Sequence, residues 1–400
     1  MNIYTDMLLK IIAGSLLALA LAADAQTSAP TVLAATPAPA AVNQPAVPMW
    51  PNLHFGPMQI SGFVDLYYSY NANHPSEEGN GQINDLYNFN DKTNQFSLSA
   101  AKLSFNHDPK PFGAHLDLIF GRTNELVNGK ASADNGKYVE QSFLSLKLAK
   151  AKGLEVDLGK FVTSAGAEVI ESKNNWNYSR SLLFVYAIPY FHWGLRSSLP
   201  LTKAETVGIQ VVNGCNNLTK SNAGPTVGLI SAYVKTKYTW DINFYTGRKH
   251  LNGQNSYLNL IDTTLQLTPT AKFNAYINYA YGHNRDSMLG SGLGATGDNQ
   301  LKHWQGAAAA VRQQVTSNTA LAGRFEYFND PQGYTTGAKQ QLYEFTTTGE
   351  YKWTKGLLGR LEYRRDWSDI DFFTRGNRPL AVKDQSTVTA SIVIFFGSNP

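Results

Sequence analysis

Apolar and polar residues alternate along most of this chain, from about residue 59 to its C-terminal end. In residues 271–283, for example, Phe273 and Ile277 lie on one face, whereas Asn274 and Asn278 lie on the other. A period of two residues is typical of a β-strand with one apolar and one polar side. The pattern therefore predicts an all-β protein built from many amphipathic strands.

Sixteen such strands can be marked, and the connections between them are alternately long and short. Connections after odd-numbered strands have about ten to thirty residues and those after even-numbered strands about two to eight, which is typical of an outer-membrane barrel. Turn signals in a soluble sandwich come at fairly even spacing instead. The predicted strands lie at 59–70, 95–106, 112–121, 138–148, 154–163, 191–199, 206–213, 226–235, 239–246, 257–268, 271–283, 302–313, 318–329, 340–352, 356–367 and 384–396.

The strand at 356–367 has the most sharply divided faces, and the strand at 318–329 adds Arg324 and Glu326 to the charged side. In a barrel, a charged face looks into the lumen, lipid surrounds the apolar face, and the closed ladder leaves no unpaired backbone in hydrocarbon. A solvated face with mutual charge pairing and no role in selectivity is the alternative interpretation. The two faces of 356–367 carry Arg360, Glu362, Arg364 and Asp366 on one side and Leu357, Leu361, Tyr363 and Trp367 on the other.

The composition also favours a barrel in a membrane. Aromatic residues make up 12% of the chain and charged residues only 16%, whereas soluble domains carry about a quarter charged residues. After the N-terminal region, no run approaches the ~20 consecutive apolar residues of a transmembrane helix, and the mean hydropathy is −0.28. The net charge of +4 gives no argument for nucleic-acid binding.

The N-terminal region predicts export from the cytoplasm. Residues 1–25 are typical of a signal peptide, because 11–21 is apolar and Ala23-Asp24-Ala25 fits a small-x-small cleavage site. Residues 26–58 are rich in Ala and Pro, which favours a flexible, extended segment. Residues 59–400 are then predicted to form a single barrel domain.

The third long connection, at about 164–190, is too apolar for a freely solvated loop, because it contains Trp176, Leu182, Leu183 and Phe184. We expect it to fold into the lumen, where wall residues such as Arg360 and Arg364 would pair with its carboxylates. Its charges would then form a constriction, since fixed charges in a narrow aqueous passage set ion preference. Surface charges on an outer loop are the alternative. The charged residues concerned are Glu168, Glu171, Lys173 and Arg180.

No motif points to catalysis, a metal or a cofactor. The stretch Gly292 to Gly297 matches G-x-G-x-x-G in letters only, because it follows no buried parallel strand and opens no helix. The eight histidines have no metal-ligand spacing, and His115 and His192 are interpreted as polar wall positions. The single cysteine, Cys215, lies in a loop sequence. We therefore expect no catalytic residues, no metal and no cofactor.

The most distinctive segment is residues 159–184, GKFVTSAGAEVIESKNNWNYSRSLLF, followed by Pro189 and Gly194. With the early GFVDLYY at 62–68 and the strand at 95–105, it resembles the β-barrel porin family of OmpL-like outer-membrane proteins. The resemblance covers residues 59–397. It implies an outer-membrane channel but no particular solute.

The sequence thus predicts a 16-stranded antiparallel barrel in the outer membrane of a Gram-negative bacterium, with small hydrophilic solutes or ions diffusing passively through it. Size exclusion and local electrostatics would select the solutes, and the expected partners are lipid, solute and further copies of the chain, such as a trimer. Two alternatives remain open at this point. The barrel acts through its surface loops, as an adhesin or a barrel enzyme, or the chain is a secreted soluble β-protein.

Overall fold

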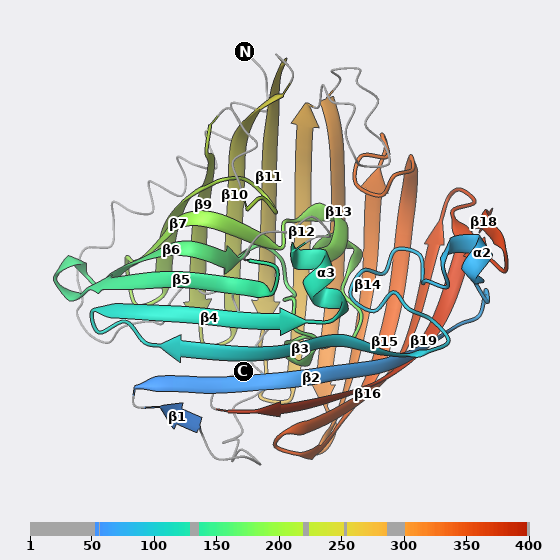
Figure 1. The fold of residues 1–400 in the computed structure, drawn as a ribbon, viewed down its shortest axis with the longest axis horizontal. Coiled ribbons are helices and arrows are strands. Elements are labelled where there is room, and N and C mark those ends of the chain that lie inside the picture. Colours follow the sequence, from blue (N-terminus) through green and yellow to red (C-terminus); the bar gives the residue numbers. More distant parts are fainter. Residues whose placement is uncertain are drawn as a thin grey trace.

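The computed structural model describes residues 53–55, 57–128, 136–218, 224–251, 254–285 and 301–397. The predicted signal peptide and the Gly-rich 292–297 stretch lie outside these residues. Within them, sixteen antiparallel strands form one closed ring, in which each strand pairs with its neighbours in the sequence and β19 closes onto β2 (Figure 1). The strands are β2 Met58–Asn71, β3 Phe96–His107, β4 Phe112–Phe120, β5 Val139–Leu148, β6 Leu154–Val162, β7 Phe191–Pro200, β8 Glu205–Val212, β9 Thr226–Lys235, β10 Tyr238–Leu251, β11 Gln254–Leu267, β12 Phe273–Arg285, β13 Leu301–Gln314, β14 Thr319–Asp330, β15 Gln340–Thr354, β16 Leu357–Ser368 and β19 Asp384–Phe396.

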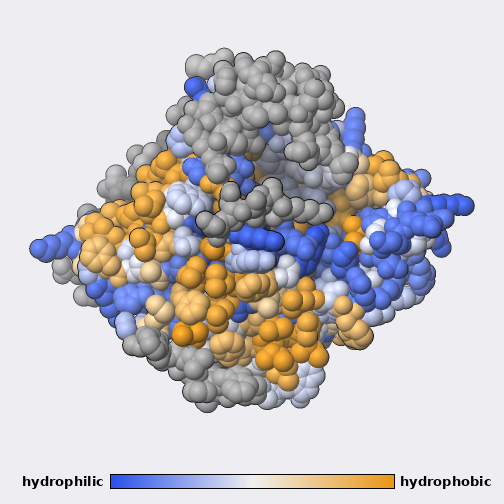
Figure 2. Space-filling model, viewed as in Figure 1, coloured by the Kyte–Doolittle hydropathy of each residue, from blue (hydrophilic) through white to orange (hydrophobic). Residues whose placement is uncertain are grey.

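The two faces of the strands lie as the alternation predicts. On β16, Leu361 is 61% exposed on the outside of the ring, whereas Arg360 and Glu362 on either side of it are buried on the inside. Tyr279 and Ile392 are likewise exposed and Asn278 is buried. Figure 2 shows hydrophobic side chains over the strands at the front and hydrophilic ones around β18 (Arg378–Val382) and α2 (Glu77–Asn80). A ring with an apolar outer surface is what a lipid environment requires.

An extra residue in β3 explains why its pattern is irregular at Ala100 and Ala101. Asp65 of β2 pairs with Ala100, but the next residue, Leu66, pairs with Leu98, so that Ser99 is skipped. Such a bulge shifts the side chains beyond it by one position and breaks a period of two.

Connection lengths follow the predicted alternation with one exception. Strands β10 and β11 extend to Leu251 and Gln254, which pair with each other, so the predicted long loop between them is wrong. The strands of the barrel also begin earlier than the predicted boundary at residue 59, because β2 starts at Met58 and β1 (Leu53–Phe55) pairs with Met58–Ile60.

Short helices and a hairpin lie in the long connections. The hairpin consists of β17 (Phe373–Arg375) and β18, and α2 contacts it. Helix α3 (Arg122–Asn128) follows β4, and the β6–β7 loop contains a 3₁₀ turn, η2 (Ser172–Asn174), and a π-helical turn, η3 (Leu183–Ala187). A further 3₁₀ turn, η1 (Ala149–Ala151), joins β5 to β6. Among the described residues, no helix is long and apolar enough to cross a membrane.

Placing arginine at Leu361 should lower the free energy of unfolding by about 2–4 kcal/mol, the cost of a cation on the lipid face near the midplane. Arginine at Ser104, which faces an internal cavity, should cost far less. Asn278 is a poor comparison, because its amide donates to Asp262 and Thr264. Urea titrations in lipid vesicles would measure both variants, and equal losses would mean that the faces are wrongly assigned.

Candidate pore-lining site

The β6–β7 loop, residues 163–190, contacts strands on opposite sides of the ring. Towards β2, the Ser172 and Tyr178 hydroxyls donate to Asp65 at 2.6 and 2.9 Å. Towards β10, the hydroxyl of Ser164 donates to the amide oxygen of Asn243 at 2.6 Å. Strands β2 and β10 are eight places apart in the ring of sixteen. The loop therefore reaches from one wall of the barrel to the other.

Carboxylates of the wall accept hydrogen bonds from the backbone of this loop. Glu362 accepts from the N–H groups of Tyr178 and Ser179 at 2.5 and 2.9 Å. Glu326 accepts from the N–H groups of Leu182 and Leu183 at 3.0 and 3.2 Å. A buried backbone N–H that lacks an acceptor is costly, so these bonds satisfy donors that the buried loop would otherwise leave unpaired. The two carboxylates thus hold two short stretches of loop backbone.

Arginines of β16 bind loop carbonyls rather than loop carboxylates. Arg360 donates to the carbonyl oxygens of Ser172 and Asn175 at 2.6 and 2.7 Å, and Arg364 donates to that of Arg180 at 2.7 Å. The pairing of Arg360 and Arg364 with loop carboxylates, expected from the sequence, is therefore wrong.

The acidic partners of these two arginines lie on the wall itself. Arg360 contacts Glu350 at 2.8 Å, and Arg364 contacts Asp366 at 2.6 Å. With their charges balanced locally, the arginines have donors left over for the carbonyls of the loop.

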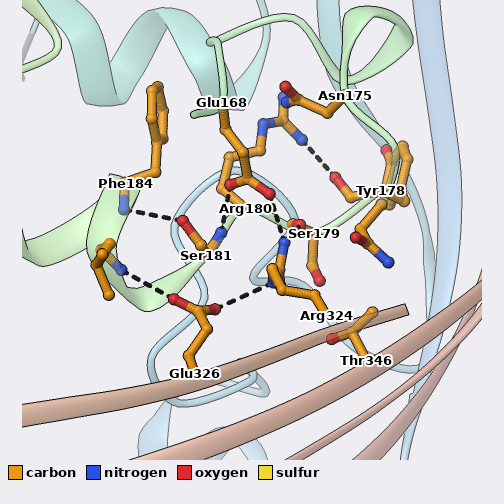
Figure 3. Close-up of polar contacts among 12 residues, drawn as sticks. Glu168, Asn175, Tyr178, Ser179, Arg180, Ser181, Phe184, Arg324, Glu326 and Thr346 are labelled. Carbon is orange, nitrogen blue, oxygen red and sulfur yellow. Dashed lines mark hydrogen bonds and ion pairs between the residues drawn. The ribbon is translucent and has the colours of Figure 1, made fainter. Parts of the chain in front are cut away.

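Glu168 is the loop carboxylate that does pair with the wall, and its partner is Arg324 of β14. The two side chains are 2.6 Å apart, and both are buried. The other oxygen of Glu168 accepts from the N–H of Ser181 at 2.6 Å (Figure 3). Arg324 also contacts Glu326 at 3.1 Å and Glu344 at 3.0 Å. One guanidinium therefore joins three carboxylates from the loop and two strands.

Arg180 and Glu171 have different surroundings. The guanidinium of Arg180 is buried, donates to the carbonyls of Ile170 and Tyr178, and lies over the ring of Phe89. It stabilises the fold of the loop and presents no charge to open solvent. Glu171 is half-buried and pairs at 2.5 Å with Lys102 of β3.

The sequence pattern gives no signal for Lys102 or for its other two partners. Asp117 of β4 and Glu140 of β5 each lie 2.7 Å from the ammonium group of Lys102. All three come from strands whose faces the pattern did not resolve. Glu140 is also the residue skipped by the register shift between β4 and β5, where Asp117 pairs with Gln141 and Leu118 with Val139. An alternation with a period of two residues cannot predict which face of the sheet such a skipped residue lies on.

A cavity of about 600 Å³ lies between the wall formed by β2–β7 and the nearby part of the β6–β7 loop. Ser61, Lys102 and Asp117 line it from the wall, and Glu171 and Lys173 line it from the loop. The cavity also extends to the β3–β4 turn, where Asp108 lines it.

Apolar packing supplements the polar contacts of the loop. Trp176, Leu182, Leu183 and Phe184 are all buried, which confirms that this segment does not lie in open water. Leu183 packs in one cluster with Leu258, Leu260, Trp304 and Phe328, which come from β11, β13 and β14. Burying apolar area of this kind stabilises by about 25 cal/mol per Å².

In the part of the chain that the structure describes, no group of three or more His, Cys, Asp or Glu side chains is placed to hold a metal ion. His115 lines the cavity, and His192 is buried and stacked on Tyr245.

The family model described as "Putative beta-barrel porin-2, OmpL-like" matches residues 57–396. The chain belongs to this porin family. Family membership and the closed barrel together make it a porin-like channel for passive diffusion. No curated protein matches the sequence.

Solved structures of porins and other outer-membrane proteins have the same fold at low sequence identity. The anion-selective porin from Comamonas acidovorans is 11% identical with a TM-score of 0.56, covering 85% of this chain and 99% of its own. The channel DcaP of Acinetobacter baumannii is 11% identical with a TM-score of 0.57, covering 84% and 97%. OmpT of Vibrio cholerae, in a trimer form, is 12% identical with a TM-score of 0.53, covering 85% and 99%.

Proposed function

We propose that this porin passes small hydrophilic solutes or ions across the outer membrane of a Gram-negative bacterium, and that the β6–β7 loop narrows its lumen. Barrels of about 16 strands are wide enough for an aqueous channel. The observation that carries the proposal is the set of contacts from this loop to both Asp65 of β2 and Asn243 of β10. The proposal assigns the protein no catalytic role, in keeping with its family.

The position in the membrane follows from the outer surface and the turns. Exposed aromatic side chains lie near both ends of the strands, such as Trp240 and Trp353 near the short turns and Tyr70 and Phe96 near the long loops. Girdles of aromatic residues at both interfaces are a feature of outer-membrane barrels. We place the short turns in the periplasm. A trimer is the oligomer proposed, supported by the trimer form of one structural neighbour.

Recordings in planar bilayers test the proposal directly. The purified protein should conduct ions in discrete steps, require detergent for solubility, and shift on a denaturing gel after boiling. A barrel that inserts but does not conduct would overturn the proposal and favour a role for its surface loops. Crosslinking in native membranes would test the trimer separately.

Ion preference should depend on pH through Lys173. This half-buried side chain lines the cavity, and burial lowers its pKa to about 8, although neighbouring Glu171 opposes that shift. A lysine is cationic below its pKa, so raising the pH from about 7 to about 9.5 removes one positive charge. The reversal potential in a salt gradient should then move toward cation preference. Lys173→Met should show the shifted value already at neutral pH, and a pH response that persists in this variant would belong to another group.

A further inference from the structure

The cavity beside the β6–β7 loop has more acidic than basic groups on its lining. Its cationic side chains are Lys102, Lys173 and Arg196. Two of the acidic side chains on the lining pair with basic residues that do not line the cavity. Glu168 pairs with Arg324, and Glu155 pairs with Lys147. Glu140, behind Lys102, is one more acidic side chain next to the cavity. The carboxylates on the lining are Asp108, Asp117, Glu155, Asp157, Glu168 and Glu171.

The acidic excess is concentrated around Lys102. Its ammonium group lies 2.7 Å from Asp117, 2.7 Å from Glu140 and 2.5 Å from Glu171. The ammonium donates a hydrogen bond to Glu171, and Asp117 and Glu140 lie within ion-pair distance of it. One cation therefore faces three acidic side chains, and Lys173 on the loop is the next cation nearby.

Asp117 retains an acceptor with no donor. Its Oδ2 accepts a hydrogen bond from the Gln141 amide at 2.7 Å and lies within ion-pair distance of Lys102 and His115, but its Oδ1 has no hydrogen-bond partner although the residue is only 1% exposed. A buried acceptor left unsatisfied costs about 1–3 kcal/mol, more when it is charged. Because Asp117 lines the cavity, a donor on a molecule in the cavity is the group that would satisfy it.

Aromatic rings in the same cavity already hold cations. The Lys173 ammonium lies 5.5 Å from the centre of the Phe63 ring, and the Arg196 guanidinium lies 4.9 Å from that of Phe143. Both rings line the cavity. Ring faces attract cations electrostatically, and more strongly where water is partly excluded. The walls therefore suit an organic cation with an aliphatic body better than an anion of the same size.

We propose that this cavity is a binding subsite for solutes that carry a primary ammonium group, with Asp117 and Glu171 as its acceptors. The inference rests on the proposed channel function and names a solute class for it. A bound ammonium would donate to Oδ1 of Asp117 and share the excess charge around Lys102, while its carbon chain contacts Phe63 and Phe143.

The test uses the full-length channel in a planar bilayer with 1,4-diaminobutane added on the side of the short turns. The amine should interrupt the current briefly and reversibly, whereas 1,4-butanediol and succinate, of similar length, should not. Asp117→Asn should weaken the block at least about tenfold, as expected for loss of one charge-assisted hydrogen bond. Glu125→Gln removes an equal charge from the exposed face of α3 and should leave the block unchanged.

Glu171→Gln provides a second variant outside the strands, in case Asp117→Asn does not fold, and should weaken the block similarly. A channel that conducts but shows no block, or equal block in all variants, overturns the subsite while the channel function stands. If the wild-type protein does not conduct, the channel function fails, and calorimetric titration of the detergent-solubilised protein with the diamine then decides the subsite alone. Absence of binding there overturns it.

Discussion

Replacing residues 168–180 with a short Gly-Ser linker should raise single-channel conductance at least about twofold, because current through a pore scales with its free cross-section. This stretch supplies the hydroxyls of Ser172 and Tyr178 that contact Asp65, together with the backbone that Arg360 and Glu362 hold. Its removal should clear the part of the lumen next to β2 and β16. Planar-bilayer recordings in 1 M salt would give the conductance of both proteins.

Deletion of α2, residues 77–80, none of which is buried, controls for loop shortening in general and should not reproduce the increase. Wild-type conductance in the 168–180 replacement would place the β6–β7 loop outside the ion path. The pH dependence assigned to Lys173 would then need another origin as well, because Lys173 lies within the replaced stretch.

Replacing Arg324 with methionine should lower the free energy of unfolding by about 3–5 kcal/mol, the usual loss when one partner of a buried ion pair is removed. Methionine fills a similar volume but leaves Glu168, Glu326 and Glu344 without their common cation. Two of these carboxylates also accept from loop N–H groups, at Ser181 and at Leu182. We therefore expect the loop to detach before the barrel unfolds, with noisier and larger currents.

Arg365→Met is the matched control for that measurement. Arg365 pairs with Asp384 at 2.9 Å on the exposed outer side of β16 and β19. Exposed pairs contribute about 0–1 kcal/mol, so this variant should unfold close to the wild type. If both substitutions had equally small effects, the three carboxylates would be stable without Arg324, and its role as their common anchor would be wrong.

The strands were predictable because lipid and lumen impose a strict alternation on every crossing residue. The pattern fails where that constraint stops. Beyond Thr246, β10 continues through Gly247, Arg248, Lys249 and His250, a polar run without alternation that is typical of a loop. Backbone pairing with β11 continues through these residues, so β10 extends as a strand after its alternation has ended.

The site was only partly predictable, for a different reason. The apolar content of the β6–β7 loop predicted its burial, and Glu168, Arg324, Arg360 and Glu362 do meet there. The sequence could not predict which residues of the loop pair with which residues of the barrel wall. Most of these hydrogen bonds involve backbone atoms of the loop, which every residue possesses. Nor could the sequence predict the group around Lys102, whose members come from three strands and include a bulge residue.

The barrel wall binds the β6–β7 loop through the loop's backbone atoms more than through its side chains. Glu362 and Glu326 each accept hydrogen bonds from two adjacent backbone N–H groups. These are the N–H groups of Tyr178 and Ser179 for Glu362, and those of Leu182 and Leu183 for Glu326. Proline, which has no amide hydrogen, is therefore the residue most strongly excluded at these four positions. Other replacements at Ser179, Leu182 and Leu183 keep these amide bonds, provided that their side chains fit the surrounding packing, whereas replacing Tyr178 would also remove the hydroxyl that donates to Asp65. Side chains elsewhere in the loop can therefore differ while the charged strand residues that hold its backbone stay the same, so that substitutions in the loop can change the surroundings of a solute without rebuilding the barrel.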